Sequence, residues 1–208
     1  MTTPLTTTSH AILGLLCLRS WSTYELAKQA QRSLDWFWPR AERKLYEEPK
    51  RLVTHGLARS DKEMTGARPR TVYAVTRKGR QTLTRWLSEP PAPPVLEFEG
   101  MVKVFFADGG TIEQLRANLT CIADTAEQRL FDLRVKIDEL EESGSQFEQR
   151  VHLNALGLRF HLEHERTLRD WAHWALDQVD EWDSTTDPGL WDHRRAWADL
   201  GDGSDEMH

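Results

Sequence analysis

Four of the five residues from 90 to 94 are proline, and this cluster constrains the fold more than any other feature of the chain. Proline lacks a backbone donor and fixes its own φ angle, so no helix continues through such a run. Proline-rich segments form stiff, extended connectors instead. We therefore predict a first domain over residues 1–89, a linker over 90–96, a second domain over 97–182 and a tail over 183–208.

The two predicted domains carry opposite charges, although the chain as a whole has a net charge of only −6. Residues 1–89 hold 16 lysines and arginines against 8 aspartates and glutamates, whereas residues 90–208 hold 11 against 25. A domain with a net charge of +8 attracts a polyanion, and one with −14 is repelled by it. The first domain is thus the candidate for nucleic-acid binding.

Apolar runs and cysteines exclude several other classes of protein. The longest apolar run, residues 11–18, is far shorter than the roughly 20 residues that span a bilayer, and no basic-then-apolar leader precedes it. We expect a cytoplasmic protein that makes no membrane contact. Cys17 and Cys121 fall within apolar helical patterns, which favours buried, reduced thiols over a disulfide or a zinc site.

Three helices are predicted before residue 56. Apolar spacing indicates a first helix over residues 8–18, and a capping-box pair, Ser22 with Glu25, starts a second over 23–32. A third, over about 40–54, lies between Pro39, which suits a first turn, and Gly56, which suits a helix end. Its inward face is expected to comprise Leu45, Pro49 and Leu52, opposite a face that carries five cations and one acid.

A basic turn follows the third helix. Two strand-like runs, residues 57–64 and 70–76, flank the turn "TGARPR", and Thr76 is placed to cap a fourth helix that buries Leu83, Trp86 and Leu87. Three helices, a basic hairpin and a closing helix in this order predict a winged helix-turn-helix. The fold class is therefore mainly α with a small β-hairpin, with an N-terminal winged helix-turn-helix followed by a long-helix dimerisation domain.

These residues resemble the PadR transcriptional regulators. The resemblance rests on "ILGLL" at 12–16, "YELAKQ" at 24–29, "LYEEPKRLVTHGL" at 45–57 and "GARPRTVYAVTRKGRQTLTRWL" at 66–87. The chain departs from the family pattern at Thr23, where glycine is usual, and at Pro49, where a large apolar residue is usual. The later acidic half looks like the C-terminal domain that one PadR branch shares with virulence-activator-type regulators. The resemblance implies a dimeric, ligand-responsive DNA-binding regulator, usually a repressor.

The architecture assigns roles to the exposed cations. The N-terminal turn of the third helix is the part that enters the major groove, so we expect Arg40, Arg43 and Lys44 to read base edges. We expect a second set of side chains to contact phosphates or the minor groove: Tyr24, Lys50, Arg51, Arg68 and Arg70.

The second half of the chain predicts long helices. Residues 97–110 have the spacing of a helix with a wide apolar face. Thr111 with Gln114 forms a capping box that starts the next helix, in which apolar residues recur at intervals of three and four residues up to about Glu142. Ser145 with Glu148 is expected to start a further helix that runs to about Trp182. Helices of this length bury their apolar stripes best against a second copy, so we predict a homodimer that binds a palindromic operator.

Tryptophans and histidines allow further interpretations. Five of the nine tryptophans follow residue 170; either they pack the last helix and the dimer interface, or some of them, with Trp171 and Trp174 as candidates, bind a small aromatic effector. His161, His164 and Glu165 have a spacing compatible with metal ligands, but histidines and glutamates on a helix surface are usually solvated, and no third distant ligand is marked. We assign no metal and no cofactor.

Two other function classes compete with DNA binding. The sequence contains no phosphate-binding glycine loop, no G-x-S-x-G and no H-E-x-x-H, so we predict that the protein is not an enzyme. The alternative is a winged-helix protein-interaction module without specific DNA binding. Steep salt dependence of DNA affinity distinguishes regulator from interaction module, because phosphate contacts release counterions.

Overall fold

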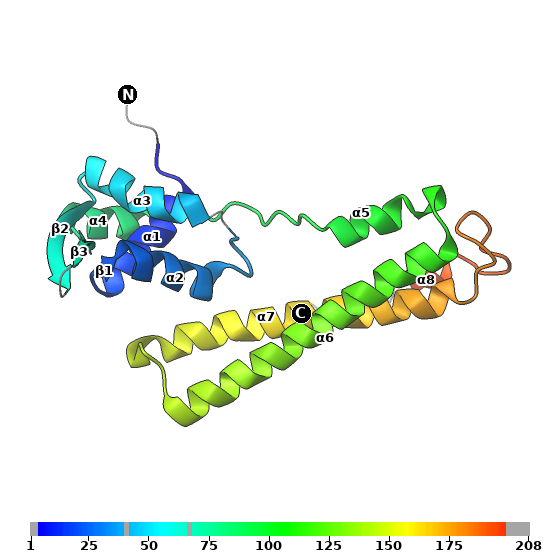
Figure 1. Cartoon of the computed structure of the whole chain (residues 1–208). Helices are drawn as coiled ribbons and strands as arrows, with labels where there is room; N and C mark the ends of the chain where they lie inside the picture. The colour runs from blue at the N-terminus through cyan, green and yellow to red at the C-terminus, as the bar shows by residue number, and fades with distance from the viewer. Residues whose placement is uncertain (1–3, 40–41, 66–67, 199–208) are drawn as a thin grey trace, which may run out of the picture. The chain divides into compact units, whose positions relative to one another are not determined.

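The computed structural model describes residues 4–39, 42–65 and 68–198 and divides into two compact units, Met1–Pro94 and Val95–His208 (Figure 1). We refer to them as the winged-helix unit and the helical unit. None of the described helices combines the length and apolarity needed to cross a lipid bilayer.

The described residues of the winged-helix unit form four helices and three short strands. In chain order these are α1 (Thr7–Leu18), β1 (Trp21–Ser22), α2 (Thr23–Leu34), α3 (Glu42–Thr54), β2 (Ala58–Thr65), β3 (Arg68–Val75) and α4 (Arg77–Leu87) (Figure 1). The strands form an antiparallel sheet in the order β1-β3-β2. The predicted winged helix-turn-helix is confirmed, with α3 beginning within two residues of its expected start.

Helix caps form at the predicted residues. The Ser22 hydroxyl accepts from the Glu25 backbone N–H at 3.3 Å, and the Glu25 carboxylate accepts from the Ser22 N–H at 2.8 Å. Hydrogen bonding from Ser22 lowers the pKa of Glu25, because it favours the charged carboxylate. Thr76 caps α4 by accepting from the Gly79 N–H at 3.0 Å. These local contacts set where α2 and α4 begin.

An apolar core joins the helices of the winged-helix unit. Its fully buried side chains come from α1, α2 and α3 and include Ile12, Leu13, Leu16, Leu26 and Leu52. Of the residues expected to pack inward from α4, Leu87 is 68% exposed, so that prediction was wrong. Leu87 is the last residue of α4, and its side chain points mostly into solvent. Trp86 instead stacks on His10 of α1, with ring centroids 4.7 Å apart.

The helical unit is built on a hairpin of two long helices. It contains α5 (Glu99–Phe105), a 3-10 turn η1 (Ala107–Gly109), α6 (Ile112–Ser143), a second turn η2 (Glu148–Arg150), α7 (Val151–Val179) and α8 (Arg195–Ala198) (Figure 1). The Thr111–Gln114 capping box is present. The predicted start of α7 at Ser145 was wrong, because the Ser145 hydroxyl accepts from the nearby Phe147 N–H and closes a local turn.

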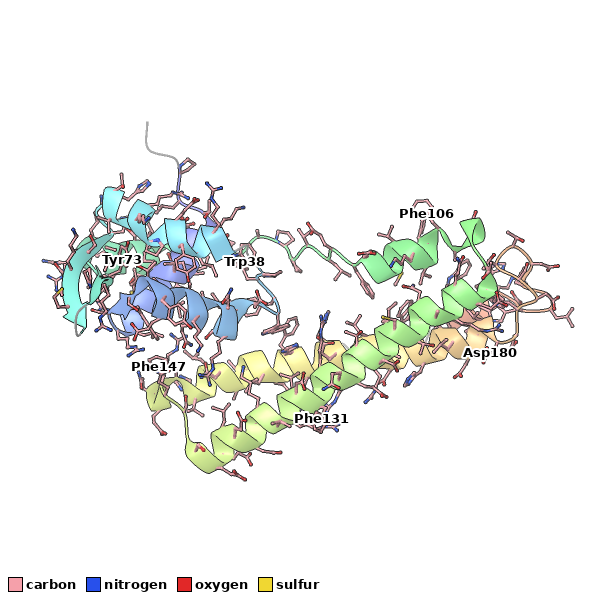
Figure 2. All side chains as sticks on the ribbon, in the orientation of Figure 1. Trp38, Tyr73, Phe106, Phe131, Phe147 and Asp180 are labelled. Atoms are coloured by element: carbon pink, nitrogen blue, oxygen red, sulfur yellow. The ribbon has the colours of Figure 1, made fainter. Side chains whose placement is uncertain are left out.

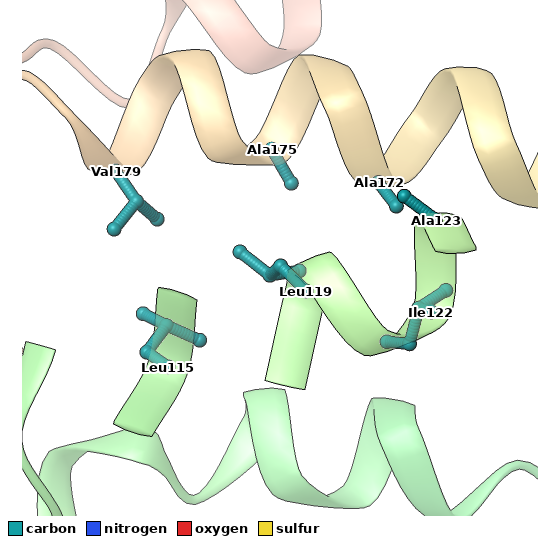
Figure 3. Close-up of a cluster of buried hydrophobic side chains, with 7 residues drawn as sticks. All are labelled: Leu115, Leu119, Ile122, Ala123, Ala172, Ala175 and Val179. Carbon is teal, nitrogen blue, oxygen red and sulfur yellow. The ribbon is translucent and has the colours of Figure 1, made fainter. Parts of the chain in front are cut away.

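A compact apolar cluster holds α6 against α7 at one end of the hairpin. Figure 3 shows the seven side chains of this cluster, which come from α6 and α7: Leu115, Leu119, Ile122, Ala123, Ala172, Ala175 and Val179. Phe98 and Trp171 pack against this cluster. Cys121 lies beside these positions on α6 but is exposed, so the prediction of a buried thiol was wrong for Cys121, whereas Cys17 is partly buried.

The other end of the hairpin buries nothing. Between residues 134 and 160 no side chain is buried within this single chain. Large apolar side chains nearby are exposed: Phe131, Val135, Leu153, Leu156 and Phe160 (Figure 2 labels Phe131 on α6). Exposed apolar surface of this extent is typical of an interaction site.

Candidate nucleic-acid interface

One face of α3 is buried and the opposite face is exposed. Leu45, Pro49 and Leu52 are buried, as predicted from their spacing. On the exposed side Arg43, Glu47, Lys50 and Thr54 follow one another at intervals of three or four residues, and we call these four residues the α3 stripe. Lys44 is exposed beside the stripe.

Arg43 and Glu47 form an ion pair within the stripe. The Arg43 Nε donates to Glu47 Oε1 at 2.7 Å, and the two side chains are 87% and 58% exposed. This hydrogen bond raises the pKa of Arg43, which stays protonated. Lys44 and Lys50 take part in no ion pair that the structure describes. Arg40, the third residue expected to read bases, lies outside the described residues.

Arg51 differs from the other cations. Its side chain is only 25% exposed, its Nη1 lies 3.3 Å from Glu48 Oε2, and its Nη2 donates to the Pro4 carbonyl. Glu48 itself is buried. The guanidinium therefore neutralises a buried acid and ties residues before α1 to α3, a structural role that the sequence did not reveal. Its expected phosphate contact stays a prediction.

The hairpin of β2 and β3 forms the wing. The strands pair in register from Ala58 opposite Val75 to Thr65 opposite Arg68, and the turn residues 66 and 67 lie outside the described part. The Arg70 Nη2 donates to Glu63 Oε2 at 3.1 Å, and both side chains are about half exposed. The two-stranded ladder thus brings Arg68 and Arg70 to the end of the hairpin, as the sequence indicated.

Tyr24 lies in the first turn of α2 and is 63% exposed. The Lys28 ammonium is 6.0 Å from the centroid of the Tyr24 ring, so a cation lies near the phenol. Phenol hydroxyls and ammonium groups are both common phosphate contacts. The start of α2 thus presents a further polar surface in the same unit as the α3 stripe and the wing.

The effector and metal candidates lie in the helical unit. Trp171 packs against the apolar cluster, and Trp174 is 40% exposed, so core packing accounts for the first of them. The sequence interpretation of His161 and Glu165 as solvated side chains was wrong, because the two are buried together between α6 and α7. Among the described residues, no three possible ligand side chains are arranged to hold a metal ion.

Comparison with known proteins agrees with this architecture. Residues 12–85 match the model of the transcriptional regulator PadR-like family, and residues 99–180 match that of the virulence activator alpha C-terminal domain. The chain carries a PadR-like domain followed by a virulence activator alpha C-terminal domain. The family consists of transcriptional regulators and not of enzymes, which confirms the prediction on catalysis.

Two curated proteins are similar in sequence to this chain. A probable transcriptional regulator of Mycobacterium tuberculosis is 35% identical over 85 residues, which cover 40% of this chain and 45% of that protein. The negative transcriptional regulator PadR of Bacillus subtilis is 25% identical over 176 residues, which cover 83% of this chain and 97% of that protein. The match thus spans less than half of the first relative and nearly all of the second.

Solved structures share the fold. Bacillus subtilis PadR in complex with operator DNA matches with a TM-score of 0.73 and 24% identity, covering 84% of this chain and 99% of that one. The same protein with p-coumaric acid matches with a TM-score of 0.67 and 25% identity, covering 83% and 98%. The Vibrio cholerae virulence activator AphA matches with a TM-score of 0.62 and 21% identity, covering 84% and 98%.

Proposed function

We propose that this PadR-like regulator is a sequence-specific, ligand-responsive repressor that binds a palindromic operator as a homodimer. The observation that carries the proposal is the α3 stripe, because an exposed row of polar and cationic side chains on the second helix of a helix-turn-helix suits the major groove. The name of the Bacillus relative, a negative transcriptional regulator, supports repression. We expect it to act in the cytoplasm, the compartment that holds bacterial DNA.

The interface residues divide by chemistry. Arg40, Arg43 and Lys44 are proposed to read base edges near the start of α3. Phosphate or minor-groove contacts are proposed for Tyr24, Lys50, Arg68 and Arg70. Arg51 is proposed to contact DNA as well as to bond to the Pro4 carbonyl. Base contacts supply specificity, and phosphate contacts supply most of the affinity and its dependence on salt.

Exposed apolar surface in the helical unit supports a homodimer. The side chains of α5 and its C-terminal neighbour include Val102, Phe105 and Phe106, which are 55%, 77% and 64% exposed in the single chain. Figure 2 labels Phe106 at this end of α5. Burial of roughly 800 Å² per partner is usual for a stable interface. A monomeric mass in light scattering at micromolar concentration would argue against the dimer.

A small aromatic acid is the proposed effector. Bacillus subtilis PadR has been crystallised with p-coumaric acid, a planar aromatic acid. We propose an effector of the same chemical class for this chain, bound by the helical unit or beside it. Binding would lower operator affinity only if the effector prefers the conformation that does not bind DNA.

Replacing Lys50 with glutamine is expected to weaken binding to all duplexes alike and to flatten its salt dependence. Each phosphate contact contributes roughly −0.9 to the slope of log affinity against log salt, so two copies of Lys50 in a dimer contribute about −1.8. Fluorescence anisotropy at several salt concentrations measures the slope. Arg134→Gln, which removes an exposed cation from α6, is the matched control and should leave the slope unchanged. An unchanged slope for Lys50→Gln would favour a protein-binding role for the unit.

A further inference from the structure

An acidic side chain occupies the middle of the α3 stripe. Glu47 lies one helical turn from Arg43 and one turn from Lys50, and 58% of its side chain is exposed. On a surface that approaches DNA, a carboxylate is repelled by phosphates and lowers the overall affinity. Its position therefore calls for a compensating contribution to binding.

The hydrogen bond between Glu47 and Arg43 supplies that contribution. The carboxylate accepts a hydrogen bond from Arg43 Nε at 2.7 Å, and the described contacts give the two terminal nitrogens, Nη1 and Nη2, no other partner. Guanine presents two acceptors in the major groove, N7 and O6, at a spacing that a guanidinium matches with two donors. A guanidinium already held at Nε loses less side-chain freedom when it binds in this way.

The described cations of α3 and the wing differ in whether they have an acidic partner. Arg43, Arg70 and Arg59 each have an acidic partner, at 2.7, 3.1 and 3.7 Å. Lys44 and Lys50 have none among the described ion pairs. An unpaired lysine is a mobile point charge that suits any phosphate, whereas an arginine fixed by a carboxylate suits one base in one orientation.

We propose that Glu47 is a specificity-determining residue that positions Arg43 to read a guanine, at the expense of general affinity for DNA. The proposal rests on the DNA-binding function proposed above. Two effects of opposite sign follow from removing the carboxylate: binding to arbitrary sequences strengthens, and discrimination at the base that Arg43 contacts weakens.

Selection of bound duplexes from a random pool tests this with the full-length protein. The wild-type motif is compared with those of Glu47→Ala, Glu47→Gln and Arg43→Ala. For Glu47→Ala we expect roughly tenfold less discrimination at the same base pair that loses its preference in Arg43→Ala. Affinity for random duplex is expected to rise severalfold. Glu47→Gln, which keeps an acceptor for Nε, should retain most of the preference while also binding random duplex more tightly.

Glu89→Ala is the matched control for charge, because it removes an exposed acid of the same unit that lies off α3. It should leave the motif intact. A Glu47→Ala motif identical to that of the wild type would overturn the proposal. So would a loss of preference at a base pair other than the one that depends on Arg43, since Glu47 would then read a base itself. If the wild-type protein enriches no motif, the DNA-binding function fails, and this inference fails with it.

Discussion

Replacing Gly79 with alanine is expected to destabilise the winged-helix unit by about 3 kcal/mol, the upper part of the usual range for overpacking. A Cβ at this position would lie closer to the Leu57 carbonyl oxygen than real Cβ atoms come to any neighbour, and 2.9 Å from Val75 Cγ2. The same carbonyl accepts from the Thr76 N–H at 3.0 Å, so backbone bonding fixes it in place. The start of α4 must therefore move away from the start of β2.

Gly14→Ala is the matched control for the Gly79 substitution. Gly14 lies inside α1, and a Cβ there would meet nothing within 4 Å. Alanine is favoured over glycine inside helices, so this variant should gain roughly 0.5–1 kcal/mol. Calorimetry of the whole chain should show the transition of the winged-helix unit lowered by more than about 10 °C for Gly79→Ala and slightly raised for Gly14→Ala. Coincident transitions for the two variants would contradict the close contact between α4 and Leu57.

Arg129→Met is expected to destabilise the helical unit by about 2–3 kcal/mol at neutral pH. Glu165 of α7 is 1% exposed, and its Oε1 lies 3.3 Å from Arg129 Nη1 and 3.2 Å from His161 Nε2. Its Oε2 has no hydrogen-bond partner among the described residues. Leaving a buried charge without its counterion usually costs about 3–5 kcal/mol. We expect less here because the Arg129 side chain is 56% exposed, so water remains near the pair.

The double variant Arg129→Met with Glu165→Leu is the control, since it removes the buried charge together with its counterion. It should recover most of the lost stability, as apolar replacements of buried pairs often do. Denaturant melts of both variants measure the difference, and equal midpoints for the two would contradict a charged, buried Glu165.

Burial lowers the pKa of His161 below its ordinary value of 6.5, so between the two pKa values the unfolded chain binds a proton that the folded chain does not bind. The wild-type unfolding free energy should therefore fall as the pH drops below 6.5.

Local patterns predicted most of the features that depend on local contacts, although the Ser145–Glu148 pair does not start a helix. The capping residues Ser22, Thr76 and Thr111 and the inward face of α3 follow from spacing within one helical turn, and all of them are present. The order of helices and strands that defines the winged helix could be predicted for the same reason, because each element carries its own start and stop residues.

Long-range contacts could not be predicted from the sequence. Arg51 is a basic residue of α3 with an acid nearby in the sequence, as Arg43 is, but its bond to Pro4 joins residues 47 positions apart. Glu165 and His161 have the spacing of solvated residues on a helix, and only the approach of Arg129 from α6 shows that they are buried. Cys121 lies in an apolar pattern but is exposed, because the buried face of α6 is narrower than the pattern suggested.

The central claim, that the exposed face of α3 and the wing read an operator, is tested most directly by selecting genomic fragments of the source organism with the purified full-length protein at two salt concentrations. We predict a palindromic motif whose half-sites are separated by one helical turn, roughly 34 Å, and an affinity that falls steeply between the two salt concentrations. Enrichment of no sequence above background, with binding insensitive to salt, would contradict the claim.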